Sequence, residues 1–208
     1  MAGDEREGRL SQRKQPQQER SIQRLDAILS AATDMMWSKG VEGLKMTELA
    51  QAAGVPIGSL YQFFPSRAAV LKALHDRHTS RVEAGTERVF SSVQSLREAQ
   101  ALTASAVDLF YAAFRDDPIY LPVWLAAEAD RDLQRLNSHH ADRLTDIVVR
   151  CFEPLLPEGL SIDLEARVAL YIEMTGATVR RAMLQTPDMA TRLLTEWKVM
   201  VGKILFTP

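Results

Sequence analysis

The stretch Met46–Ser66, MTELAQAAGVPIGSLYQFFPS, decides the fold of this chain. It contains two short segments with helical periodicity, separated by Gly54, and it ends in a run of aromatic residues. Counting Met46 as the first position, Ala50 is the fifth, Gly54 the ninth and Leu60 the fifteenth. A small alanine lets a second helix cross closely, and glycine takes up the left-handed backbone of a sharp turn without strain. The stretch therefore predicts two short helices joined by a tight turn.

This spacing is typical of a helix-turn-helix, whose second helix enters the major groove of DNA. Pro56 stands just inside the second helix, where its missing amide hydrogen costs nothing. Leu49, Val55 and Leu60 are expected to pack the two helices against a preceding helix. The same pattern also occurs in plain corners between two helices that have no DNA-binding role. The spacing alone therefore leaves both interpretations open.

The segment GSLYQFFPSRAAVL extends the pattern and resembles the tetracycline-repressor (TetR) family of bacterial transcriptional regulators. The resemblance runs from about Leu25 to Leu74, roughly a quarter of the chain, and its most specific part is LY in the short helix followed by FPS. It implies a nine-helix TetR-like fold. An N-terminal three-helix helix-turn-helix domain would bind DNA, and a larger C-terminal helical domain would bind a ligand and form the dimer.

The resemblance also implies roles for individual residues. The hydroxyl of Tyr61 is expected to contact a phosphate, Ser59 the DNA backbone, and Arg67 another phosphate. Leu60 and Phe64 are expected to be buried anchors. The full set of implied DNA-binding residues is Lys45, Thr47, Ile57, Gly58, Ser59, Tyr61, Gln62 and Arg67.

Two positions depart from the family pattern. Phe63 stands where Tyr or His is common, and because it cannot donate a hydrogen bond, one backbone contact is missing or replaced by packing. Ile57 stands where polar residues are frequent. It is expected either to meet a thymine methyl group, which apolar side chains recognise in the major groove, or to contact the arm or the first helix.

The rest of the chain shows helical periodicity without strand-like alternation, which predicts an all-α fold. We expect three parts: a flexible basic arm at 1–20, the helix-turn-helix domain at 21–66, and the ligand-binding and dimerisation domain at 67–208. The arm either contacts phosphates or a minor groove or serves only as a solubilising tail. Its basic residues are Arg6, Arg9, Arg13, Lys14 and Arg20.

The segment 168–179, VALYIEMTGATV, has one charged residue in twelve. A helix that is apolar all round must be buried on more than one side. It is expected to face its own subunit on one side and a second copy on another, with the last helix beside it. The alternative is a helix fully buried in a monomer. The residues expected at a homodimer interface are Val168, Thr175, Gly176, Val179, Trp197 and Val201.

Aromatic residues on two neighbouring predicted helices suggest a small-molecule pocket, since such sites are mostly apolar with few polar groups. Glu173 is the one charge in its apolar run, so it either meets a polar or cationic group of the ligand or faces solvent at a rim. Aromatic residues at helical spacing also form ordinary cores, and that alternative stays open. The predicted pocket residues are Phe110, Phe114, Trp124, Glu173 and Met174.

Composition narrows the class of protein further. Residues 1–85 contain 12 Lys and Arg against 10 Asp and Glu, whereas 86–208 contain 13 against 17, which suits a basic DNA-binding part on an acidic body. The single cysteine, Cys151, excludes an internal disulfide and is expected to be an inert core thiol. No run of apolar residues spans a bilayer and the N-terminus is no signal peptide. We therefore expect a cytoplasmic protein without a membrane partner.

Other classes of site have less support. His139 and His140, with the nearby acidic residues, resemble metal ligands at first, but adjacent residues of a helix point about 100° apart, so we expect no metal site. No phosphate loop, zinc spacing or nucleophile elbow is present, so we expect no enzyme and no cofactor. The sequence favours a repressor that binds a palindromic operator in double-stranded DNA as a dimer and is released by a small apolar or amphipathic effector. The alternative is a small-molecule-binding or scaffold protein without specific operator binding.

Overall fold

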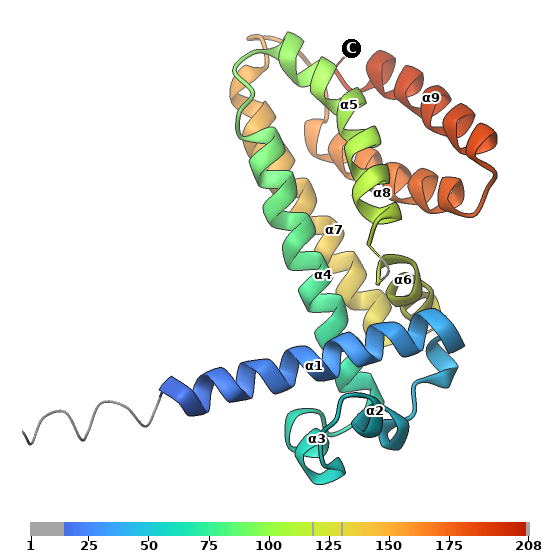
Figure 1. Ribbon diagram of the computed structural model, residues 1–208. Helices are drawn as coiled ribbons and strands as arrows, with labels where there is room; N and C mark the ends of the chain where they lie inside the picture. The colour runs from blue at the N-terminus through green and yellow to red at the C-terminus, as the bar shows by residue number, and fades with distance from the viewer. Residues whose placement is uncertain (1–14, 118, 130, 207–208) are drawn as a thin grey trace, which may run out of the picture. The chain divides into compact units, whose positions relative to one another are not determined.

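The computed structural model describes residues 15–206 except 118 and 130, and all secondary structure in this part of the chain is helical (Figure 1). Nine α-helices and two short 3-10 helices follow one another, which confirms the predicted all-α class. They are α1 (Gln15–Lys39), η1 (Val41–Gly43), α2 (Met46–Ala52), α3 (Ile57–Phe63), α4 (Arg67–Phe90), α5 (Leu96–Arg115), α6 (Tyr120–Ala129), α7 (Arg131–Phe152), η2 (Glu153–Leu155), α8 (Leu164–Met183) and α9 (Pro187–Ile204).

The chain divides into two compact units, Met1–Leu74 and His75–Pro208. We call them the DNA-side unit and the cavity unit. The division falls inside α4, later than the boundary expected after residue 66. Helix α4 therefore contributes its first two turns to one unit and the remainder to the other.

Helix α1 begins at Gln15, so the last six residues of the segment expected to be a flexible arm are helical. Pro16 lies in the first turn of this helix, where a missing amide hydrogen breaks no intrahelical bond. The other basic residues predicted for the arm, Arg6, Arg9, Arg13 and Lys14, lie outside the described residues.

The core of the DNA-side unit comes from the apolar stripe of α1, from residues of α2, α3 and the start of α4, and from Leu44 and Phe64 between helices. Ser66 caps α4, because its hydroxyl accepts a hydrogen bond from the amide of Ala69 at 3.3 Å. This cap and the apolar residues after it fix the start of α4 against the shorter helices. The buried residues are Ile28, Leu29, Ala32, Met35, Met36, Leu44, Leu49, Ala50, Leu60, Phe64, Val70, Leu71 and Leu74.

In the cavity unit, α8 packs against both α7 and α9, and α5 packs against α9. Phe152 joins Phe90 and Phe206 through edge-to-face ring contacts with centroids 5.4 and 5.3 Å apart. Cys151 packs against this core, and burial raises the pKa of its thiol, as the expectation of an inert side chain requires. Across the described residues, no helix has the length and apolar character needed to cross a membrane.

Candidate nucleic-acid interface and candidate ligand cavity

The turn between α2 and α3 has the geometry that the sequence predicted. Gly54 has φ 66°, in the left-handed region. Its amide donates to the carbonyl of Gln51 at 3.2 Å, and the amide of Val55 donates to that of Ala50 at 3.0 Å. This pair of hydrogen bonds satisfies carbonyls at the end of α2 and reverses the chain sharply. The helix-turn-helix therefore rests on local backbone bonding (Figure 1).

Two anchors hold α3 in place. Leu60, in the middle of the helix, is fully buried, and Phe64 directly after it is nearly so. Leu49 of α2 is also fully buried, whereas Val55 in the turn is half-buried. The expected roles of Leu60 and Phe64 as core residues are thereby confirmed, and the opposite side of α3 is left for a partner.

That opposite side carries the residues predicted to meet DNA. Ile57, Gly58, Tyr61 and Gln62 are exposed, and Tyr61 shows 48% of its surface to solvent. A Cβ atom added to Gly58 would meet nothing within 4 Å, so the backbone can approach another surface closely at this point. Phe63, the departure from the family pattern, is half-buried and packs rather than reaching outward.

Basic residues flank α3. Lys45 occupies the N-cap of α2 without a side-chain capping bond, and it lies 3.5 Å from Glu48. Lys39 also pairs with Glu48, at 2.8 Å. Arg67, at the start of α4, lies 3.5 Å from a carboxylate oxygen of Glu42. All these pairs are exposed, where ion pairs contribute little, so the cations are free to turn towards phosphates. Thr47 is exposed beside them.

One basic residue at this surface, Arg24, was not predicted from the sequence. A shallow hollow of ≈ 350 Å³ runs along α1 and the turn, and Arg20, Arg24 and Ser59 line it. Arg20 was expected in the arm and Arg24 was not singled out, because an arginine on the exposed face of an amphipathic helix gives no functional signal. The hollow places two guanidinium groups near the start of α3.

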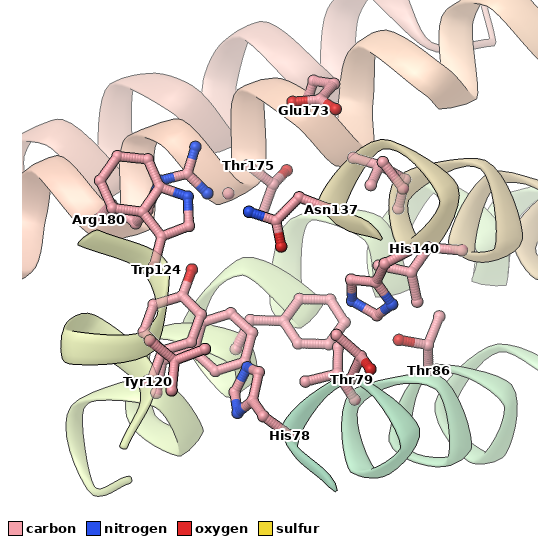
Figure 2. A pocket seen from close by; sticks show the side chains of 18 of the residues that line it. His78, Thr79, Thr86, Tyr120, Trp124, Asn137, His140, Glu173, Thr175 and Arg180 are labelled. Carbon is pink, nitrogen blue, oxygen red and sulfur yellow. The ribbon is translucent and has the colours of Figure 1, made fainter. Parts of the chain in front are cut away.

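The cavity unit encloses a cavity of ≈ 330 Å³, within the range typical of small-molecule sites (Figure 2). Helices α4 to α8 all contribute to its lining, and four of the five predicted pocket residues belong to it: Phe110, Phe114, Trp124 and Glu173. The fifth, Met174, is not part of the lining, and its side chain is 46% exposed. Helix α8 lines the cavity with Tyr171, Ile172, Glu173, Thr175, Gly176 and Arg180.

Aromatic side chains form one wall of the cavity. The rings of Phe114 and Tyr120 stack with centroids 3.9 Å apart, and Phe110 lies 6.0 Å from Phe114. The guanidinium carbon of Arg180 lies 4.1 Å from the ring centre of Trp124. This wall offers flat apolar surface with one cation at its end (Figure 2).

Polar residues line the rest of the cavity, and the sequence did not reveal most of them. His75 Nε2 lies 2.7 Å from Asn137 Oδ1, and His140 Nδ1 lies 2.8 Å from Glu83 Oε1. His78 packs beside the aromatic rings, 5.0 Å from that of Tyr120, and contacts Asp117, which also binds Arg81. These pairs join α4 to residues 39 to 62 positions further along the chain. No local pattern signals such partners.

His140 is expected to make the stability of the cavity unit depend on pH. Burial is the main cause that lowers the pKa of its imidazole below the ordinary 6.5. Burial would raise the pKa of Glu83, but hydrogen bonds from Arg143 and His140 outweigh it and lower that pKa. Below pH 6.5 the imidazole is protonated in the unfolded chain but not to the same extent in the folded one. The free energy of unfolding therefore decreases as the pH is lowered through this range. The Glu83 contribution is lost only in more acidic solution, below 4.5.

We therefore expect urea denaturation to show a less stable cavity unit at about pH 5.5 than at about pH 7.5. His140→Gln should flatten this dependence, because glutamine does not titrate. His139→Gln is the matched control, since His139 is the exposed neighbour on the same helix. An equal slope in the wild type and both variants would show that His140 does not carry the effect.

Four of the residues predicted for the dimer interface, Val168, Thr175, Val179 and Val201, are buried inside the core of their own chain. Trp197 is half-buried and donates from its indole nitrogen to the Thr175 hydroxyl at 2.9 Å. An all-round apolar helix does not reveal which side faces its own subunit, and the place of these residues in a homodimer interface stays a prediction.

Gly176, also predicted for the interface, is half-buried and lines the cavity. The other side of α8 instead exposes Leu170, Met174 and Leu184, and α9 exposes Met189, Val199 and Met200.

Two family models match this chain, one in its N-terminal part and one in its C-terminal part. Residues 97–208 match the model of the tetracyclin repressor-like C-terminal domain, and residues 28–74 match that of bacterial regulatory proteins of the tetR family. The first match alone spans more than half of the chain. The protein therefore belongs to the tetracycline-repressor family, whose members are regulators and not enzymes. Regulators of this family bind DNA and small-molecule ligands, typically as dimers.

Individual relatives are more distant. The chain is 36% identical over 72 residues to the HTH-type transcriptional repressor KstR of Mycolicibacterium smegmatis, a match that covers 35% of this chain and 33% of that repressor. The matched part is thus about a third of the relative's length.

Two solved structures share the fold. Salmonella enterica GusR aligns with a TM-score of 0.67 at 16% identity, covering 88% of this chain and 95% of its own. FadR from Bacillus subtilis, solved in complex with stearoyl-CoA, aligns with a TM-score of 0.61 at 18% identity, covering 87% and 97%.

Proposed function

We propose that the chain is a transcriptional repressor that binds a two-fold symmetric operator as a homodimer and leaves it when a small molecule fills the cavity. One observation carries the DNA-binding part: α3 is held by the buried Leu60 and presents Ile57, Tyr61 and Gln62 on its exposed side. A side chain can read base edges only from such a face.

The exposed residues divide by chemistry into two groups. Ile57 and Gln62 can discriminate bases, since an apolar group meets the thymine methyl and an amide pairs with adenine. Tyr61 and Arg67 carry hydrogen-bond donors suited to phosphates, which every DNA sequence offers. The first group is therefore assigned to specificity and the second to affinity.

This division predicts two distinct results from mutation. Tyr61→Phe and Arg67→Gln should weaken binding to all duplexes, and Arg67→Gln should reduce the dependence of log affinity on log salt by about one ion. Ile57→Ala and Gln62→Ala should instead change which base is preferred. Titration of operator variants at several salt concentrations measures both effects.

Arg88→Gln is the matched control for Arg67→Gln, because Arg88 is an exposed arginine on the same helix but in the cavity unit. It should leave the salt dependence unchanged. Uniform weakening by all four interface variants, with no change of preferred sequence, would contradict the division.

Exposed apolar side chains support the dimer. Leu170 and Met174 lie four residues apart on α8, Leu184 follows ten residues later at its C-cap, and α9 beside α8 exposes Val199 and Met200. Exposed apolar stripes on two adjacent helices suit an isologous interface, in which each copy supplies the same patch. A dimer also explains how short helices such as α3 reach enough base pairs, because two copies read both halves of a palindrome.

Release by a ligand follows from linkage. A molecule in the cavity touches His78 and Thr79 of α4, the same helix whose first residue, Arg67, flanks α3. The ligand shifts operator binding only as far as it prefers one position of α4 over another. This preference is the quantity that links cavity occupancy to repression.

A further inference from the structure

The cavity is lined by one half-buried cation, Arg180, which has no carboxylate partner among the described residues. The Arg180 guanidinium stacks on Trp124 at 4.1 Å, and a Cβ atom added to Gly176 would lie 2.8 Å from its Nη1 atom. Among the described residues, no carboxylate forms an ion pair with it. A half-buried arginine that lines a cavity presents its planar set of donors to whatever enters it.

The nearest polar group does not neutralise this charge. The Tyr120 hydroxyl accepts a hydrogen bond from Arg180, but burial raises its pKa more than the neighbouring cation lowers it. The phenol therefore keeps its proton. Because its oxygen already accepts from Arg180, its hydrogen is left to donate to a ligand.

Further hydrogen-bonding groups face the same space. The Asn137 oxygen is bound to His75, which leaves its amide nitrogen as a donor towards the centre of the cavity (Figure 2). The Thr86 hydroxyl is fully buried and has no hydrogen-bond partner within the described structure. A buried hydroxyl without a partner costs free energy unless a ligand or water satisfies it.

Acidic residues near the cavity are already engaged or face outward. Glu83 binds His140 and Arg143, and Asp117 binds His78 and Arg81. Glu173, the one acidic residue of the described lining, is exposed to solvent, which supports its rim interpretation. The described interior thus offers donors and a positive charge beside an aromatic wall, and no buried carboxylate faces them.

We propose that the effector is a flat, apolar organic monocarboxylate. Its carboxylate binds the Arg180 guanidinium and the Tyr120 hydroxyl. Its ring system lies along Phe110, Phe114 and Trp124, and a polar substituent at its far end reaches Thr86. This assignment names the ligand class of the cavity and rests on the proposed function only for the effect of that ligand on DNA.

The direct test is calorimetric titration of the protein, without DNA, with three molecules of the same shape: naphthoate, naphthamide and naphthylmethylammonium. The carboxylate should bind at least about tenfold more tightly than the neutral amide, since hydrogen bonds between charged groups are the stronger ones. The ammonium should bind weakest. Equal binding of amide and carboxylate, preference for the ammonium, or no binding of the carboxylate at millimolar concentration would overturn the proposal.

Two variants test whether the preference for the carboxylate comes from the Arg180 side chain. Arg180→Met should lower naphthoate affinity on the order of 10- to 100-fold and leave naphthamide affinity nearly unchanged. Arg181→Met is the matched control, because Arg181 is its exposed neighbour on α8 and lies outside the lining. Unchanged naphthoate affinity in Arg180→Met would overturn the proposal.

Gly176→Ala supplies a variant that is expected to fold well. Alanine is favoured over glycine within a helix, and the atom that must shift is the end of the flexible Arg180 side chain. This variant should keep or raise the melting temperature and weaken naphthoate more than naphthamide. Equal weakening of both ligands would contradict the role of Arg180.

A measurement of operator binding in the presence of each ligand distinguishes the proposed ligand class from the proposed release mechanism. If naphthoate binds through Arg180 but leaves the protein on its operator, the ligand class stands and the release mechanism fails. If the protein binds an operator and is released only by the amide or the ammonium, the proposed function stands and the ligand class fails.

Discussion

Leu60→Ala is expected to destabilise the DNA-side unit by about 2–5 kcal/mol and to abolish operator binding. Leu60 is fully buried in the middle of α3, so truncation leaves a cavity under the helix that presents Tyr61 and Gln62. Because α3 has only seven residues, it cannot stay helical without this packing. Hydrogen exchange of amides in α2 and α3, together with operator titration, measures both effects.

Tyr61→Ala is the matched control for this variant. Tyr61 is the next residue, but its side chain is half exposed. Its truncation should weaken DNA binding while changing the free energy of unfolding by only about 0.5 kcal/mol. In both variants, ligand binding in the cavity unit should persist. Similar exchange protection in Leu60→Ala and wild type would show that Leu60 is not the anchor of α3.

Leu170→Glu is expected to turn the dimer into monomers and to lower operator affinity on the order of 10²-fold or more, as the loss of a second linked binding module does. Leu170 is 64% exposed on α8, so the isolated chain tolerates the charge. In an isologous interface each copy brings the same glutamate, so the cost counts twice. Sedimentation measures the oligomeric state, and titration measures the affinity.

Leu125→Glu controls for surface charge, because Leu125 is a comparably exposed leucine on α6. It should leave the dimer intact. A wild-type protein that sediments as a monomer, or a Leu170→Glu protein that remains a dimer, would contradict the assignment of the α8 surface.

Local features of the fold could be predicted because their causes lie within a few residues. Gly54 makes a turn that only short-range backbone bonds define, and Ser66 caps α4 through an amide three residues away. Leu60 is buried because the spacing of the two short helices requires an apolar contact there. In each case the sequence contains the whole physical reason.

Features that depend on distant contacts could not be predicted. Arg180 becomes a cavity residue only because α6 brings Trp124 beside it. Val168 and Leu170 are both apolar residues of one helix, yet the first is buried and the second exposed, because α7 and α9 cover one side of α8. Aromatic residues of the pocket were foreseeable since large rings seek burial, whereas the polar lining depends on which helix lies opposite.

The most direct test of specific operator binding is binding-site selection with the purified protein and random duplex DNA. We expect enrichment of one motif with two-fold symmetry, whose half-sites lie a whole number of helical turns apart. The failure of folded protein to enrich any motif at low salt would contradict it, and would favour a small-molecule-binding or scaffold protein without specific operator binding.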